Sequence, residues 1–215
     1  MKMFISSVFF TLAIASLAQE DPYAKEILDR VAQKANAYST ISLDYSFTVE
    51  DKKTNDKKTE EGQIIIKGKK YKINIGVSEI FCDGKAIYTY LKSVQEVNIV
   101  AYDEQASSAD MTNPRNLFTM YTKEYKYEYI GEEAMDGRIF HKIDLYPRNL
   151  KSSYARLRLF VDKNKDELYC VQIQAKNGNY YTFKILDVKT NISVPDTEFT
   201  FNSADYPGVE VVDLR

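Results

Sequence analysis

The chain has 215 residues with 29 Lys or Arg and 31 Asp or Glu, which gives a formal net charge of −2 at pH 7. Basic and acidic residues are mixed along the sequence, which argues against the clustered basic surface of a nucleic-acid-binding protein. A single histidine cannot supply a multi-histidine metal site, and neither a dinucleotide-binding fingerprint nor a phosphate-binding loop occurs, so we expect no cofactor and no metal.

The N-terminus has the pattern of a secretory signal peptide. Lys2 precedes an apolar run over residues 4–15, and Ser16-Leu17-Ala18 follows with small residues at both recognition positions. The run is shorter than the roughly 20 apolar residues that a bilayer crossing needs. We therefore expect that residues 1–18 are cleaved, that residues 19–215 form one domain, and that this domain is not stably inserted in a membrane.

A helix is predicted to follow the signal peptide. Asp21 is a good N-cap and Pro22 suits the first helical position. Apolar residues then recur at helical spacing at Ala24, Ile27, Leu28, Val31, Ala35 and Tyr38. This pattern indicates one amphipathic helix of about four turns, whose apolar stripe must lie against another element.

From residue 41 the hydrophobic period changes to two, which predicts a half-buried antiparallel strand with Ile41, Leu43, Tyr45, Phe47 and Val49 on one face. The charged stretch 51–60 is interpreted as a solvated hairpin loop without a function, and the next strand is expected at 62–67. Further strands are predicted at 71–75, 79–82, 86–91, 96–100, 125–131, 138–145, 154–161, 168–175 and 180–188, with turns at Asp83-Gly84, Asp136-Gly137 and Asn177-Gly178.

The pattern breaks between residues 101 and 123, where Asn113-Pro114 is expected to cap a short helix with Leu117, Phe118 and Tyr121. About ten strands and one or two helices predict a mainly β fold with α: an incomplete antiparallel β-barrel, or strongly curved sheet, with one open side covered by helices. Alternation places Tyr71, Ile73 and Ile75 on one face, and Ala155, Leu157, Leu159 and Val161 on one face of a later strand.

Residues that could carry catalysis are sparse. His141 lies in a strand, on the face of Lys142 and Asp144 or at the edge of that face, and we interpret it as a structural or exposed histidine because no nucleophile elbow accompanies it. A glycosidase carboxylate pair is assembled in space, so spacing alone does not exclude one. Cys82 and Cys170 could form a disulfide, but we favour two buried thiols because a chain of this length needs no staple.

Aromatic residues are abundant, with 17 Tyr and 11 Phe. Tyrosine suits half-buried strands, and a broad apolar cavity with a polar rim is equally compatible with this composition.

In their order and spacing, these features resemble the outer-membrane lipoprotein carrier family LolA. The pieces are the cleaved signal, the helix that begins at Asp21-Pro22, the strand Leu43-Asp44-Tyr45-Ser46-Phe47-Thr48, Glu61-Gly62-Gln63, the segments 68–73 and 82–90, and the ending 199–215. The resemblance implies a half-barrel whose apolar concavity, under a helical lid, takes the acyl chains of lipoproteins. It further implies a monomeric periplasmic chaperone that receives acylated lipoproteins from an inner-membrane ABC-type releasing complex and passes them to an outer-membrane acceptor.

The resemblance assigns roles to particular residues. The lipid-binding cavity is expected to involve Leu43, Tyr45, Phe47, Tyr71, Ile73, Ile75, Tyr88 and Tyr90, and the lid Ile27, Leu28, Val31, Leu117 and Phe118. The family commonly has an arginine before a proline where this chain has Lys67-Gly68. We expect Lys67 to be a weaker or differently built lid latch, because lysine lacks the planar fork of arginine.

Other functions are compatible with this fold. The family's lipid-anchored receptor is disfavoured because no cysteine lies directly after the signal, and an envelope sensor of lipids or lipoproteins usually carries an additional domain. A lipid or glycan hydrolase would need a catalytic constellation that the sequence does not display. The sequence therefore predicts a carrier rather than an enzyme.

Overall fold

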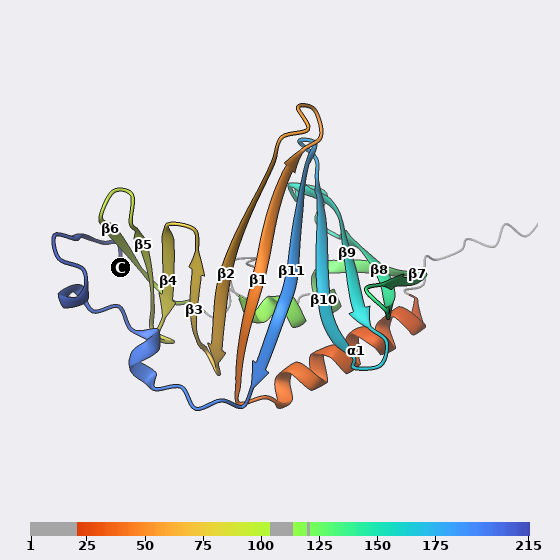
Figure 1. Cartoon of the computed structure of the whole chain (residues 1–215), viewed down its shortest axis with the longest axis horizontal. Helices are drawn as coiled ribbons and strands as arrows, with labels where there is room; N and C mark the ends of the chain where they lie inside the picture. Colours follow the sequence, from red (N-terminus) through yellow and green to blue (C-terminus); the bar gives the residue numbers. More distant parts are fainter. Residues whose placement is uncertain (1–20, 104–113, 120) are drawn as a thin grey trace, which may run out of the picture.

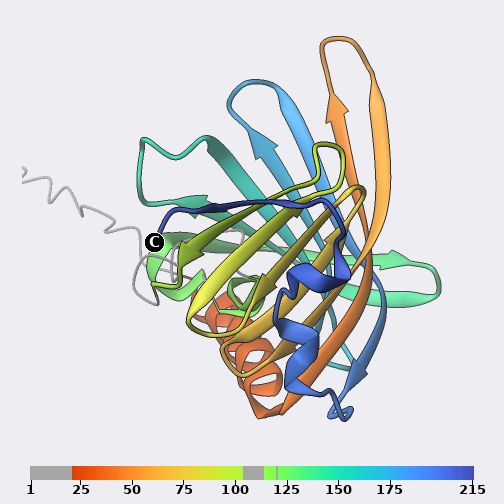
Figure 2. The ribbon, with the colours of Figure 1, turned by 90° about the vertical axis from the view of Figure 1, so that its left-hand side faces the viewer.

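The computed structural model describes residues 21–103, 114–119 and 121–215. They form one sheet of twelve strands in the order β12-β6-β5-β4-β3-β2-β1-β11-β10-β9-β8-β7. Figures 1 and 2 show that this sheet is curved and does not close on itself. The pairs are antiparallel from β6 through β7, while β12 runs parallel to β6. The predicted incomplete barrel with a helix is confirmed.

The bounds of the elements follow the hydrophobic pattern. The strands are β1 (Thr40–Asp51), β2 (Lys57–Lys67), β3 (Lys70–Ile75), β4 (Ser78–Cys82), β5 (Ala86–Leu91), β6 (Glu96–Ala101), β7 (Tyr125–Met135), β8 (Arg138–Pro147), β9 (Tyr154–Asp162), β10 (Glu167–Ala175), β11 (Asn179–Thr190) and β12 (Glu210–Asp213). The helices are α1 (Pro22–Ala37), α3 (Tyr121–Glu124) and the 3-10 turns η1 (Pro114–Phe118), η2 (Asp196–Phe199) and η3 (Ser203–Asp205).

Helix α1 begins where the sequence predicts. One carboxylate oxygen of Asp21 accepts hydrogen bonds from the amides of Tyr23 and Ala24 at 2.9 and 3.1 Å, as an N-cap does. The other oxygen accepts the amide of Tyr129 on β7 at 3.0 Å. Burial by itself raises the pKa of Asp21, but the three hydrogen bonds from backbone amides lower it by more than burial raises it. The pKa of Asp21 therefore lies below its usual value. One side chain thus caps the helix and fastens it to the edge of the sheet.

The main core lies between the sheet and the helices α1 and η1, on what we call the inner face. Ala24, Ile27, Leu28 and Val31 of α1 are buried there. Alternate residues of the strands meet them, including Leu43, Ile64, Ile143, Leu157 and Val171. Helix α1 packs near β7 and β10, so one end of the half-barrel is filled by helix (Figure 1).

The outer face of β3 to β6 is covered by the chain after residue 190, which we call the C-terminal segment. Figure 2 shows this segment, in dark blue, crossing those strands. Phe201 stacks on Tyr206 at 4.7 Å between ring centroids and also contacts Tyr88 and Phe81. Strand β12 then pairs with β6 and covers that edge of the sheet.

Three details differ from the sequence-based expectations. Strands β1 and β2 extend into the charged stretch, so their turn comprises only residues 52–56. Strand β12 was not predicted. Ala155 is the extra residue of a β-bulge between Tyr154 and Arg156, so Ala155 is exposed and does not share the face of Leu157. Residues 1–18, the predicted signal, lie outside the described residues.

Candidate functional site

An apolar cavity of about 440 Å³ lies on the inner face beneath η1. Its walls are side chains of β1 to β4, β9 to β11 and η1, namely Phe47, Ile64, Ile73, Ile75, Ile80, Pro114, Leu117, Tyr154, Val171, Ile173, Tyr181 and Phe183. The volume falls within the roughly 300–1,000 Å³ of small-molecule sites. The hydroxyls of Tyr154 and Tyr181 are the polar side-chain groups of this lining. Such a surface suits an apolar chain.

The register of the sheet brings these residues together. Ile73 of β3 pairs with Ile64 of β2 and with Ile80 of β4. Across the middle of the sheet, Phe183 of β11 pairs with Phe47 of β1 and Val171 of β10. Paired residues point to the same side of a sheet, so these residues form a continuous apolar floor.

One wall beside the cavity depends on a glycine. Tyr45 is buried, stacks on Phe183 at 4.8 Å between centroids, and donates its hydroxyl to the carbonyl oxygen of Asn74 at 3.2 Å. A Cβ at Gly62 would lie 2.6 Å from the Tyr45 hydroxyl and 2.2 Å from the Asn74 oxygen. Burial, with a smaller effect of Glu60, raises the pKa of Tyr45 to about 12, so the ring stays neutral.

Segment η1 covers the cavity, and η1 and the short helix α3 are each held by a hydrogen bond. Arg115 donates to the backbone carbonyl of Gly68, in the turn between β2 and β3. The hydroxyl of Tyr121 donates to the carbonyl of Leu28 in α1 at 2.5 Å. Burial is the main cause that raises the pKa of Tyr121. These contacts tie the cover both to the sheet and to α1.

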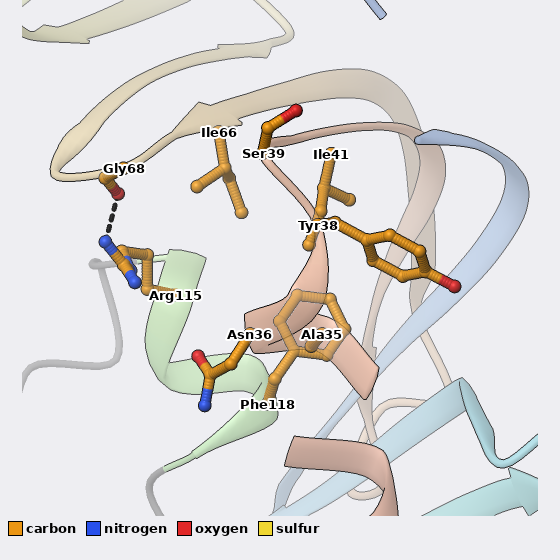
Figure 3. A pocket seen from close by; sticks show the side chains of 9 residues that line it. All are labelled: Ala35, Asn36, Tyr38, Ser39, Ile41, Ile66, Gly68, Arg115 and Phe118. Carbon is orange, nitrogen blue, oxygen red and sulfur yellow. Dashed lines mark hydrogen bonds between the residues drawn. The ribbon is translucent and has the colours of Figure 1, made fainter. Parts of the chain in front are cut away.

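A second pocket of about 210 Å³ lies on the other side of η1, between α1 and the start of β1. Figure 3 shows the ring of Phe118 in this pocket beside Ala35, with Ile41 and Ile66 opposite and Arg115 directed at Gly68. Leu117 therefore faces the large cavity while Phe118 faces the smaller pocket. Segment η1 forms a partition between two spaces.

The residues expected at the cavity fall into three groups. Phe47, Ile73 and Ile75 line it. Leu43, Tyr45 and Tyr71 are buried in the adjoining inner-face core. Of the expected lid residues, Leu117 lines the cavity, whereas Ile27, Leu28 and Val31 fill the core under α1 without appearing in its lining.

Tyr88 and Tyr90 require a correction, because both lie on the outer face. Tyr88 pairs with Phe81, and Tyr90 contacts Tyr206 at 4.5 Å between centroids, so both pack against the C-terminal segment. The strand alternation was correct, but the sequence did not show which face of β5 is covered by the C-terminal segment.

Lys67 contacts the C-terminal segment. Its ammonium group donates to the carbonyl of Val194 at 2.7 Å and to Asp196 at 2.9 Å, and Lys70 pairs with the same aspartate at 2.7 Å. The contact between η1 and the β2–β3 turn comes from Arg115 on η1. Lys67 therefore joins β2 to the chain after β11.

Several cavity residues were not singled out from the sequence. Val171, Ile173, Tyr181 and Phe183 lie in strands whose alternation was recognised. The sequence shows that these residues share one face of their strands. Assigning that face to a cavity also requires knowing that β1 pairs with β11, and these two strands lie more than a hundred residues apart in the sequence.

His141 is buried on the inner face, on the same side as Ile143 and Leu145, which corrects its predicted position beside Lys142 and Asp144. Its Nδ1 lies 3.3 Å from the Tyr129 hydroxyl, and the ring of Tyr23 from α1 lies against it at 5.9 Å. Burial is the main cause that lowers the pKa of His141, so the ring is neutral in the folded protein at pH 7.

Cys82 and Cys170 are free thiols, as favoured from the sequence. Cys82 lies in the inner-face core and Cys170 in a small outer-face cluster with Phe140 and Phe160. Burial raises the pKa of both thiols, that of Cys170 to about 11. Both are therefore poor nucleophiles at neutral pH.

In the part of the chain that the structure describes, no group of three or more His, Cys, Asp or Glu side chains could hold a metal ion. Within the same residues, no helix has the length and apolar character needed to cross a membrane.

Comparisons with known proteins give one family and a fold. The sequence profile of the family described as outer membrane lipoprotein carrier protein LolA matches residues 14–134, more than half of the chain. No curated protein matches at a significant level. Among solved structures, an uncharacterized conserved protein from Thermus thermophilus is similar at 13% identity and TM-score 0.58, over 89% of this chain and 99% of that one.

Two further structural matches have lower scores. Lipoprotein LppX from Mycobacterium tuberculosis is 10% identical with a TM-score of 0.51, over 81% of this chain and 98% of LppX. A LolA superfamily protein from Nitrosomonas europaea is 14% identical with a TM-score of 0.44, over 83% of this chain and 97% of that one. At these identities, the matches with TM-scores above 0.5 establish a shared fold.

Proposed function

The chain belongs to the family of the outer membrane lipoprotein carrier protein LolA, and from this premise we propose that it carries lipoproteins with their acyl chains in the cavity beneath η1. In this proposal residues 1–18 are a cleaved signal and the carrier works in the periplasm. It takes acylated lipoproteins from an inner-membrane ABC-type releasing complex and delivers them to an outer-membrane acceptor. It catalyses no reaction.

The observation that carries the proposal is the composition of the cavity. Its floor is aliphatic and aromatic carbon contributed by seven strands, and Leu117 and Pro114 close it from above. Each acyl methylene exposed to water costs about 0.8 kcal/mol, so a lipoprotein can cross an aqueous gap only if its chains are covered. In the described part of the chain the sheet ends at β12 and at β7, which are not paired with each other, so the half-barrel can also widen without breaking a closed ladder.

The contacts of the cover supply a release mechanism. Segment η1 is held to the β2–β3 turn by Arg115 and followed by Tyr121, which bonds to α1. Displacing η1 costs these bonds and exposes Leu117 and Phe118, so the cover returns when the acyl chain leaves. The empty protein therefore favours the covered state.

The test is binding of a synthetic diacylated lipopeptide in solution, followed by gel filtration and titration calorimetry. Ile75→Asp places a carboxylate in the cavity wall, and we expect it to weaken binding at least about tenfold. Ile139→Asp, at an exposed position on β8 outside the cavity, is the matched control and should bind as the natural chain does.

A transfer assay completes this test. Membrane vesicles that hold a labelled lipoprotein and the releasing complex are incubated with ATP and the protein, and the label should elute with the protein. Absence of a soluble complex, under conditions in which a known carrier forms one, would refute the proposal.

A further inference from the structure

One end of the half-barrel carries a concentration of positive charge. Five turns lie at this end, and together with the strand residues Asp51, Lys57 and Lys58 beside the first of them they make up residues 51–58, 76–77, 92–95, 148–153 and 176–178, which we call the basic rim. Figure 1 shows them along the upper side of the sheet, away from α1. The Cε of Lys53 would lie 3.4 Å from a Cβ at Gly178, and the amide of Lys92 donates to the carbonyl of Val77 at 3.0 Å, so neighbouring turns meet.

The rim has eight basic residues, Lys52, Lys53, Lys57, Lys58, Lys92, Arg148, Lys151 and Lys176, against two acidic ones, Asp51 and Asp56. Its formal charge is thus +6 in a chain whose net charge is −2. The turns at the opposite end, at residues 68–69, 83–85, 136–137 and 163–166, carry four lysines and three aspartates. Charge is therefore strongly separated along the strand direction.

The basic residues of the rim lie at the protein surface. All eight residues are exposed. Lys52 in the turn pairs with Glu50 of β1, and Lys58 pairs with Glu60 of its own strand, β2. Lys53, Lys92 and Lys151 have no acidic partner among the residues that the structure describes.

Three large aliphatic side chains project between these lysines. Val77 is 59% exposed, Val94 62% and Leu150 87%. They stand at the tips of three different turns and line no cavity described above. Exposed aliphatic tips surrounded by lysine are the side chains that enter the headgroup region of a lipid bilayer.

The basic rim also lies next to the walls of the cavity. Of the residues that line the cavity, Ile75 directly precedes Gly76, Tyr154 directly follows Ser153, and Tyr181 is three residues after Gly178. The upper wall of the cavity thus ends in the rim, whereas α1 fills the opposite end.

From this arrangement we propose that the basic rim docks the protein on an anionic lipid surface, with Val77, Val94 and Leu150 in the headgroup layer and the cavity directed at the membrane. Seven of the eight basic residues are lysines. Lysine is depleted at protein–protein interfaces, where arginine is enriched, so lipid headgroups fit this surface better than an acidic protein does. The inference goes beyond carriage and assigns a function to the charged stretch 51–60.

The experiment is a flotation assay in which the exported, purified chain is mixed either with vesicles that contain phosphatidylglycerol or with vesicles of phosphatidylcholine alone. The N-terminus of the purified chain is first determined by mass spectrometry. We expect binding to the anionic vesicles that declines steeply with added salt. The triple variant Lys53→Glu, Lys92→Glu, Lys151→Glu should lose binding about tenfold or more. The matched control Lys85→Glu, Lys165→Glu, Lys189→Glu makes the same charge change at the other end and should bind as the natural chain does.

The aliphatic tips are tested separately by Val94→Ser with Leu150→Ser, which should lower the binding that persists at high salt. Circular dichroism of every variant verifies the fold. Absence of binding to the anionic vesicles, equal binding to both vesicle types, or equal losses in the rim and control triples would overturn the proposal, and the first outcome would point to an acidic protein as the partner. The vesicles contain no lipopeptide, so failure here and failure of lipopeptide binding in solution are distinguishable.

Discussion

At the scale of single residues, the buried carboxylate of Asp144 is matched to two arginines. Asp144 has a side chain only 2% exposed and accepts hydrogen bonds from Arg158 at 2.6 and 2.7 Å and from Arg156 at 3.1 Å. Buried charge requires this degree of pairing, because an unpaired carboxylate would be expensive to desolvate. A positive charge on His141 would be less well compensated, because the ring is buried and, among the residues that the structure describes, one carboxylate, that of Glu132, lies at 3.9 Å from it.

His141 makes the stability of the fold depend on pH. Burial lowers its pKa in the folded protein below the unfolded value of 6.5, so the unfolded chain binds more protons between these two pKa values. The free energy of unfolding should therefore fall as the pH drops through 6.5 toward the folded pKa. Urea unfolding at about pH 7.5 and about pH 5.5 measures this, above the range in which carboxylates titrate.

The control for this effect is His141→Gln, which keeps a polar side chain that does not titrate. We expect the loss of stability between the two pH values to be smaller in the variant. An identical loss in both proteins would show that His141 is not responsible.

Residue roles differ in how far the sequence determines them. The N-cap at Asp21 is a local signal, and the structure has it where predicted. Its second bond, to Tyr129, joins residues more than a hundred positions apart and leaves no local pattern. The same holds for Lys67, whose partner Asp196 lies at the far end of the chain.

At the scale of elements, the C-terminal segment is the largest feature that the sequence did not place. Alternation predicted β5 correctly, but Tyr88 and Tyr90 were assigned to the cavity. The outer face of β3 to β6 also carries aromatic side chains, which pack against Phe201 and Tyr206. A half-barrel with apolar residues on both faces has no polar side to mark the exterior, so period two alone cannot tell the faces apart. The bulge at Ala155 is likewise invisible to a strict alternation.

The two faces are expected to respond differently to mutation. Phe201→Ala removes a ring that contacts four aromatic residues, and we expect it to lower the free energy of unfolding by about 2–3 kcal/mol, since the ring is partly buried. Affinity for the diacylated lipopeptide should change less than about twofold. Urea unfolding and calorimetry on the same samples measure both quantities.

Ile75→Ala is the comparison for the inner face, because Ile75 lines the cavity and is only partly buried. It should reduce lipopeptide affinity more than Phe201→Ala does and stability less. Loss of lipopeptide binding in folded Phe201→Ala would contradict the assignment of the outer face to stability alone.

At the scale of the whole molecule, the half-barrel combines a filled end with a hollow one. Helix α1 packs Ile27, Leu28 and Val31 against the inner face at one end, and the strands continue beyond it around the cavity to the basic rim. Length, alternation and the helix signals predict the curved sheet and its cover. The hollow is not predictable in this way, because the same apolar residues would equally fill a packed core, and only the positions of α1 and η1 decide which inner-face residues remain uncovered.

A cavity kept for a ligand reduces the stability of the empty protein, because wall atoms lose contacts that a packed core would supply. Val171→Phe fills part of the cavity from its floor, where Val171 is 1% exposed. We expect it to raise the free energy of unfolding by about 1 kcal/mol while it lowers lipopeptide affinity about tenfold. The control Val161→Phe adds the same ring at a buried core position that is not part of the cavity lining, where overpacking should cost about 1–3 kcal/mol. If Val171→Phe is more stable but binds the lipopeptide with unchanged affinity, the acyl chains bind elsewhere. If its stability rises while its lipopeptide affinity falls, the cavity is retained for its ligand at the expense of stability.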